Sequence, residues 1–295
     1  MSERARGAAP GLDFLLLLLL LLPAALATAV TPSALTAQLR RDAPLQPVSE
    51  VVRGDWLVGI GLSNAAGGTY PISGYTGDLL SLGELTVAYG LGDRALIQVS
   101  GAVAQRLSIE SASEASIPLD PTSGDVTTDA GDFRITTAFA PIGSTVGFSA
   151  GGLVEVKLPN SDEKKGIGTN TTDVTLGLIG SWGADTWRGT GTVGIAILEA
   201  PVDDFEQNDL VSYAFDVLVR ASSRIRVALG VAGLASVRRT TPLGTESRGA
   251  ATLGGEWLVG SFRLDASVAR GYAGNTPDWR LAAGVAWFRS SGGGS

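Results

Sequence analysis

The sequence has neither cysteine nor histidine among its 295 residues. Without cysteine the chain has no disulfide bond, no thiolate nucleophile, no cysteine-ligated metal and no lipid-anchored cysteine. Without histidine it lacks the commonest general base and the commonest metal ligand, so a Ser-His or Cys-His catalytic pair cannot be assembled. We therefore predict a protein that is not an enzyme and that holds no cofactor and no metal.

Basic charge and long hydrophobic runs are also scarce. The net charge of −7 argues against a nucleic-acid partner, which would need a basic face. Beyond the N-terminus no apolar run is long enough for a membrane-spanning helix, although 44% of the residues are hydrophobic and the mean hydropathy is positive. High hydropathy without spanning helices is typical of a transmembrane β-barrel, in which only alternate residues face lipid.

The clearest alternation lies in residues 210–237, LVSYAFDVLVRASSRIRVALGVAGLASV. In each half of this stretch large apolar residues occupy one parity, and small or charged residues occupy the other. Because successive strand side chains point to opposite faces, the pattern predicts a hairpin with one apolar face. Strands of soluble proteins usually have about 5–6 residues, whereas these have about 10 or more, the length that crosses a bilayer at a tilt.

Twelve alternating runs begin at residue 51, and the links between them alternate in length. Short links follow the even-numbered runs, as at residues 90–93, and longer links follow most odd-numbered runs, as at 63–78 and 106–130. Tight turns at one end and long loops at the other are typical of outer-membrane barrels. We predict an all-β, transmembrane, antiparallel up-and-down barrel over residues 51–288, with strands at 51–62, 79–89, 94–105, 131–139, 145–158, 173–182, 187–198, 209–220, 224–238, 247–258, 262–272 and 278–288.

The segments that flank the barrel have their own signals. Residues 1–29 are predicted to be a cleavable signal peptide, because two arginines precede eight consecutive leucines and a small-residue site ends at Ala29. An uncleaved anchor is the alternative, although the apolar run is short for a membrane span. Residues 30–50 are a periplasmic lead-in or a plug, and residues 289–295 are a polar Gly/Ser tail. Together these features predict an integral protein of the outer membrane.

Aromatic residues on the apolar parity gather beside the short links. Amphipathic rings prefer the headgroup level of a membrane, so this pattern indicates the girdle at the periplasmic interface. Ordinary core aromatics would not concentrate at one end of successive hairpins. The predicted girdle residues are Trp56, Tyr89, Phe139, Trp182, Trp187, Trp257, Phe262 and Trp287.

The opposite parity is expected to line the lumen, and it is mostly Gly, Ala, Ser and Thr with charged residues among them. Ionised groups inside a cylinder surrounded by lipid need water or partners. Two interpretations stay open: ion pairs that fill a narrow barrel, or a narrow channel whose arginines orient the polar or anionic end of a solute. The candidate lining residues are Arg134, Glu155, Lys157, Asp216, Arg220, Arg226, Arg263, Asp265 and Arg280.

One part of the chain, residues 154–198, resembles a known family. A strand ends in Lys157, Leu158 and Pro159, a polar loop with a Gly-x-Gly at 166–168 follows, and Asp173 opens the next apolar strand. This order is similar to that of the outer-membrane proteins associated with meta-pathway phenol degradation. The resemblance implies a transporter for small molecules, aromatic or otherwise hydrophobic ones included, and it implies no catalytic residue.

The leading hypothesis is therefore an outer-membrane channel or transporter for small molecules. The partners expected of it are outer-membrane lipids, the outer-membrane assembly machinery and a small-molecule solute. The alternative is a non-transporting barrel, structural or adhesive, that acts through its acidic extracellular loops at residues 106–130 and 199–208.

Overall fold

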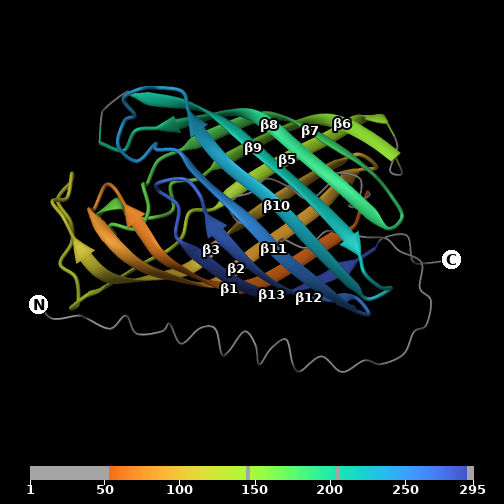
Figure 1. Cartoon of the computed structure of the whole chain (residues 1–295), viewed down its shortest axis with the longest axis horizontal. Coiled ribbons are helices and arrows are strands. Elements are labelled where there is room, and N and C mark those ends of the chain that lie inside the picture. The colour runs from red at the N-terminus through yellow and green to blue at the C-terminus, as the bar shows by residue number, and fades with distance from the viewer. Residues whose placement is uncertain (1–52, 144–146, 203–205, 291–295) are drawn as a thin grey trace, which may run out of the picture. The chain divides into compact units, whose positions relative to one another are not determined.

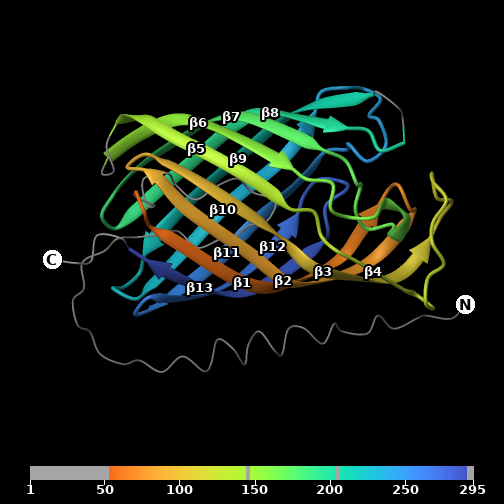
Figure 2. The same ribbon diagram turned by 180° about the vertical axis from the view of Figure 1, so that it is seen from behind.

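The computed structural model describes residues 53–143, 147–202 and 206–290, which form a closed antiparallel β-barrel (Figures 1 and 2). Twelve long strands make the wall, and a short additional strand, β4, pairs with β3. A single-turn 3-10 helix, η1 (Glu163–Lys165), lies in a loop. The strands are β1 (Trp56–Tyr70), β2 (Tyr75–Gly92), β3 (Ala95–Ala112), β4 (Val126–Asp129), β5 (Arg134–Gly143), β6 (Gly147–Lys157), β7 (Asp173–Ala184), β8 (Trp187–Glu199), β9 (Gln207–Arg220), β10 (Ile225–Ser236), β11 (Arg248–Val259), β12 (Phe262–Gly271) and β13 (Trp279–Arg289).

The long strands pair in sequence order, and the ring closes where the first strand meets the last. β1 pairs with β13 from Trp56 opposite Arg289 to Ala66 opposite Trp279. Links of a few residues lie together at one end of the barrel, which we name the short-turn end. The other end, named the long-loop end, carries most of the longer connections and lies at the left of Figure 1.

Apolar side chains cover the outer wall. In β10, Leu229 is 62% exposed, whereas its neighbours Ala228 and Gly230 are buried in the wall or lumen. The same alternation places Val, Leu and Ile side chains on the outside of the other long strands. A continuous apolar surface of this kind is stable only against lipid, and a closed ladder leaves no unpaired strand edge there. The wall is therefore the membrane-spanning part of the chain.

Aromatic rings pack over glycines on this outer wall. A Cβ atom at Gly189 would lie 2.8 Å from the ring of Trp182, and one at Gly233 would lie 2.9 Å from the ring of Tyr213. Each glycine lies directly opposite the aromatic residue on the neighbouring strand. The missing side chain lets the ring lie against the neighbouring backbone, which keeps large rings close to the wall.

The structure corrects the predicted connections at the long-loop end. The link expected at residues 63–78 is wrong, because β1 and β2 continue as a ladder and leave only the turn 71–74. The loop expected at 106–130 contains the end of β3 and all of β4. These ladder extensions are rich in Gly, Ser and Thr, and they do not present the apolar parity that faces lipid. Hydrophobic alternation therefore detected only the lipid-crossing part of each strand.

Three predicted segments lie outside the described residues: the signal peptide at 1–29, the possible plug at 30–50 and most of the tail at 289–295. Within the described residues, no helix is long and apolar enough to cross a membrane. The first strand begins at Trp56 rather than at residue 51, after a turn at 53–54.

A charged side chain introduced on the lipid-facing surface should destabilise the barrel by an amount that depends on its depth in the membrane. Leu229 lies midway along β10, so Leu229→Arg should destabilise the barrel by about 2–4 kcal/mol. Val237 is 80% exposed just past the end of β10, and Val237→Arg should cost about 1 kcal/mol or less. Urea unfolding of the protein refolded into lipid vesicles measures both. Equal costs at the two positions would contradict the membrane depth given to β10.

Candidate functional site

A cavity of about 390 Å³ lies inside the barrel toward the long-loop end. Inward-facing residues of every long strand except β12 contribute to its wall. Sites for small molecules are usually roughly 300–1,000 Å³ and mostly apolar, with a few placed polar groups. Here the large aliphatic side chains of the wall are Ile72, Leu79, Leu153, Ile167, Leu198 and Leu234.

Four of the predicted lumen residues line this cavity, and each is engaged with a charge of opposite sign. Arg134 Nε lies 3.5 Å from Glu155 Oε1. Arg280 Nη2 lies 3.2 Å from Glu84 Oε1, which joins β13 to β2 across β1. The fourth residue is Lys157. These contacts are those of the ion-paired lumen, the first of the two interpretations of the sequence.

Lys157 is the most heavily bonded cation of the cavity. Its Nζ atom lies 3.0 Å from Asp173 Oδ2 and 3.4 Å from Asp132 Oδ2. It also donates hydrogen bonds to the hydroxyls of Thr169, at 2.6 Å, and Thr171, at 3.0 Å. The side chain is buried, so this full set of partners offsets the loss of hydration of its charge. Lys157 thereby ties β6 to β7 and to the loops at the mouth.

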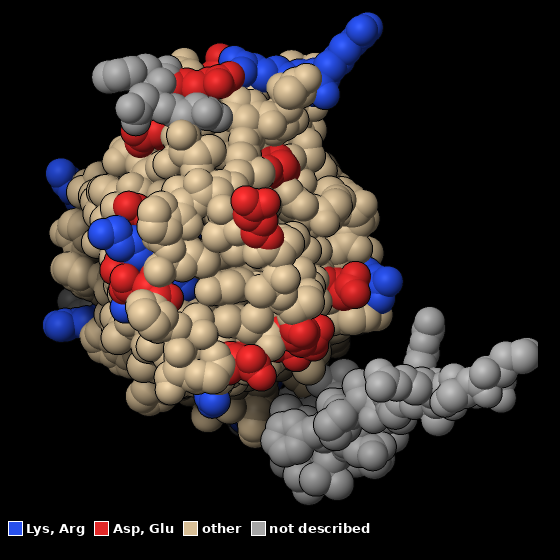
Figure 3. All heavy atoms as spheres, turned by 90° about the vertical axis from the view of Figure 1, so that its left-hand side faces the viewer, with Lys and Arg blue, Asp and Glu red and all other residues tan. Residues whose placement is uncertain are grey.

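The turn 71–74 is the centre of a cap over the cavity. The backbone oxygen of Ile72 accepts a hydrogen bond from the backbone of Ser116 at 2.9 Å. Ser73 Oγ donates to the backbone oxygen of Gly166 at 2.8 Å, and Ile72 packs beside Gly244. Residues of the first, second, third and fifth long-loop connections therefore meet above the lumen. Figure 3 views the barrel from this end.

An exposed ion pair links two of the connections that form this cap. Lys165 Nζ lies 2.8 Å from Asp120 Oδ2. The hydrogen bond from Lys165 lowers the pKa of the Asp120 carboxyl, and the same bond raises the pKa of Lys165. Other acidic side chains are spread over this end (Figure 3). In the part of the chain that the structure describes, no group of three or more acidic side chains is placed to hold a metal ion.

Below the cavity, an apolar cluster fills one side of the lumen at the short-turn end. Its buried members come from β1, β2, β3, β5, β6 and β7, and Ala286 and Phe288 of β13 pack against it. Leu153 belongs to both the cluster and the cavity wall. The cluster is therefore the floor of the cavity on that side, and its buried residues are Leu57, Ala88, Leu96, Ala138, Ala140, Leu153 and Ile179.

A buried group of charges fills the opposite side of the short-turn end. Arg226 Nη1 lies 3.5 Å from Glu256 Oε2, and Arg263 Nη1 lies 3.9 Å from the same oxygen. The side chains of both arginines are 4% exposed and that of Glu256 is 0% exposed, so one carboxylate is shared by two cations away from bulk solvent. This group bridges the three neighbouring strands β10, β11 and β12.

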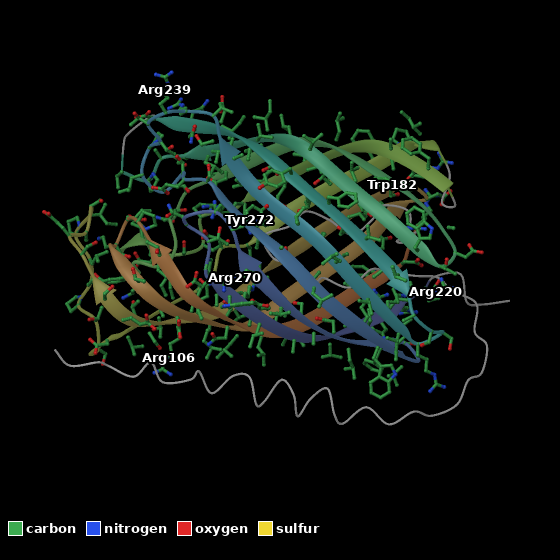
Figure 4. All side chains as sticks on the ribbon, in the orientation of Figure 1. Arg106, Trp182, Arg220, Arg239, Arg270 and Tyr272 are labelled. Atoms are coloured by element: carbon green, nitrogen blue, oxygen red, sulfur yellow. The ribbon has the colours of Figure 1, made fainter. Side chains whose placement is uncertain are left out.

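The remaining predicted lumen residues do not line the cavity. Asp216, Arg220 and Asp265 alternate with exposed apolar neighbours, as inward-facing residues do, but they belong to the levels below it. Arg220 lies at the short-turn end in Figure 4. Asp265 packs against the backbone of Gly284 on β13.

The predicted girdle residues lie on the outer wall beside the short turns. Seven of the eight are exposed, and Tyr89 is partly covered by Trp56, whose ring centre is 4.6 Å away. At the other end of the wall, Tyr213 and Tyr272 share a hydroxyl contact of 2.8 Å. Arg270 lies over the ring of Trp279 at 4.6 Å (Figure 4).

Sequence reasoning missed several residues that shape the cavity. Arg248, at the start of β11, lines it, but it was not among the lining residues predicted from the strand 247–258. Arg248 lies an even number of residues before Glu256 on the same strand, so both side chains point to the same face. This spacing could have identified Arg248 as inward-facing. Ile72 carried no such signal, because its burial depends on contacts between connections far apart in the chain.

The fold is shared with solved membrane barrels. An outer membrane channel from Pseudomonas putida F1 aligns with a TM-score of 0.59 and 15% identity, covering 82% of this chain and 98% of that one. The NanC porin aligns with a TM-score of 0.49 and 9% identity, covering 79% and 98%. The translocator domain of the autotransporter NalP from Neisseria meningitidis aligns with a TM-score of 0.48 and 13% identity, covering 81% and 90%. No protein-family model and no curated protein matches the sequence.

The shared carboxylate of Glu256 predicts a large stability effect. Glu256→Gln leaves Arg226 and Arg263 buried without this charge, so the barrel should lose about 3–5 kcal/mol. The matched control is Glu206→Gln, which removes the carboxylate of the exposed Arg238–Glu206 pair at 3.1 Å and should cost about 1 kcal/mol or less. Urea unfolding in lipid vesicles measures the difference, and similar losses would show that the Glu256 group is solvated.

Proposed function

We propose that this chain is an outer-membrane channel that carries small molecules through the lumen of its barrel. The observation that supports it most is the 390 Å³ cavity inside the barrel, lined by the wall and by residues of the long-loop connections. A space in this position is a stage on a path from one end of the barrel to the other. The Pseudomonas putida protein with the same fold is described as an outer membrane channel.

The solutes that fit this cavity are small and partly apolar. Six leucine and isoleucine side chains contribute to its wall, and most of its cations are already neutralised by carboxylates. A wall that combines aliphatic side chains with polar groups favours molecules with an apolar or aromatic body and a polar end over fully hydrated ions. The resemblance to the phenol-degradation family supports the same class of solute.

Passage through the lumen requires the short-turn end to open. The side chains of Leu57 and Leu96 are almost completely buried in the apolar floor, so a solute leaving the cavity must displace part of this cluster. The cap at the long-loop end is held by backbone hydrogen bonds and surface ion pairs, which are weak enough to exchange with water. Transport is therefore a gated passage, and the floor is the narrower barrier.

The proposal also covers where the protein resides and how it reaches that place. The apolar outer wall and its aromatic girdle suit outer-membrane lipids, the outer-membrane assembly machinery inserts the barrel, and the leucine-rich segment at residues 1–29 directs export. A second candidate is a non-transporting barrel that acts through its acidic loops. The closure of both ends and the acidic side chains at the long-loop end favour that candidate (Figure 3).

Enlarging the floor separates the two candidates. Leu96 is fully buried in the apolar cluster, so Leu96→Ala should raise single-channel conductance and the rate of liposome swelling by small solutes. It should also cost about 2–5 kcal/mol of stability. The control is Leu178→Ala, because Leu178 is 66% exposed on the lipid face and its truncation leaves the lumen unchanged. If wild type and Leu96→Ala both fold but neither conducts nor takes up solute, the channel proposal fails and the non-transporting candidate stands.

A further inference from the structure

Among the described residues that line the cavity, one cation has a side chain with no ion pair or hydrogen bond. The wall of the cavity contains Arg134, Lys157, Arg248 and Arg280. The other three lie within 3.5 Å of a carboxylate oxygen. Across residues 53–143, 147–202 and 206–290, the guanidinium of Arg248 forms neither an ion pair nor a hydrogen bond. Arg248 therefore presents its full charge to the interior of the cavity.

The chemistry of this side chain selects its ligand. Arginine stays protonated at any physiological pH, and its planar fork of donors matches the two oxygens of a carboxylate. Bidentate pairs of this kind are stronger than neutral hydrogen bonds, above all where bulk water is excluded. An arginine that faces this cavity without an ion pair to another described residue is thus suited to bind an anionic group that enters it.

The wall next to Arg248 is apolar. Leu234 on β10 lies directly opposite Arg248 on β11 in the strand register. Leu234 packs against the cluster of Ala196, Leu198 and Leu210 on the next two strands. A cation therefore lies at the edge of an aliphatic surface that continues around the lumen. A ligand that satisfies both features has a carboxylate at one end and an apolar body beside it.

A nearby acid limits the charge that the site accepts. Glu246 also lines the cavity, and its Oε1 atom accepts a hydrogen bond from the backbone of Gly244 at 3.0 Å. This fixed carboxylate would repel a second negative charge on the ligand. The site therefore suits a monoanion better than a dicarboxylate.

We propose that Arg248 binds the carboxylate of small amphipathic monocarboxylates, while Leu234 and its neighbours hold their apolar body. This inference rests on the proposed channel function, because the cavity is then the place where such solutes pause during passage. It narrows the solute class from small apolar molecules in general to those with one anionic end.

Calorimetric titration of the folded full-length mature chain in detergent tests the site, with benzoate as the probe and benzamide as its neutral match. Benzoate should bind more tightly than benzamide, and Arg248→Gln should weaken benzoate binding by about tenfold or more. Arg248→Lys should give an intermediate affinity, because it keeps the charge and loses the fork. Glu246→Gln keeps an acceptor for Gly244 and should tighten benzoate binding.

The matched control is Arg239→Gln, because Arg239 is an exposed arginine at the long-loop end that does not line the cavity (Figure 4). This variant should bind benzoate as wild type does. The heat-dependent gel shift of a folded barrel verifies that every variant is native before titration. A fall in benzoate affinity for Arg248→Gln alone supports the inference.

Equal affinity of wild type and Arg248→Gln for benzoate, or equal affinity of wild type for benzoate and benzamide, would overturn the inference. So would the absence of benzoate binding by wild type. Uptake of neutral solutes by proteoliposomes is measured in parallel, so that loss of the anion site with uptake intact leaves the channel function standing. Benzoate binding without uptake of any solute would instead remove the channel function and keep the site.

Discussion

The whole structure depends on one constraint, which is that backbone N–H and C=O groups inside a membrane must be bonded within the chain. The pairing of β1 with β13 meets this constraint by removing the two free edges of the sheet. Once the ring is closed, each residue of a long strand faces either lipid or lumen. The apolar outer wall and the mixed interior are both consequences of that closure.

Closure also determines how charge is arranged inside. An ionised side chain in the lumen cannot reach lipid or bulk water, so it must find a partner or a polar space. At the short-turn end, Arg226 and Arg263 share Glu256, and across β1 Arg280 meets Glu84. The Glu256 group fills the lower lumen together with the apolar cluster around Leu96, whereas Arg280 belongs to the wall of the cavity. The open space that remains lies above them, beneath the cap formed by the long-loop connections.

The cations of the cavity differ in how many partners their side chains have, and this difference suits them to different roles. Lys157, with two carboxylates and two hydroxyls, is committed to holding loops and strands together. Arg248 has no such commitment to another described residue, and it lies beside the aliphatic surface of Leu234. A cation whose donors are all bonded within the protein stabilises the wall, whereas a cation with unused donors is able to bind a solute. The same lumen thus contains the ion pairs that the sequence offered as one alternative, and an arginine that we propose meets the other by orienting a solute.

The sequence by itself determined the class of fold, the positions of the twelve long strands and the parity of their side chains, because lipid imposes a period of two on every strand that crosses it. It did not reveal the ladder extensions of β1 and β2, where no lipid enforces the pattern. It also did not reveal which charges pair, because Arg280 and Glu84 are far apart in sequence and meet only when the ring closes. The cavity, its cap at Ile72 and the unmatched Arg248 depend on contacts between distant connections. Such contacts leave no periodic signal in the sequence, so only the tertiary structure decided them.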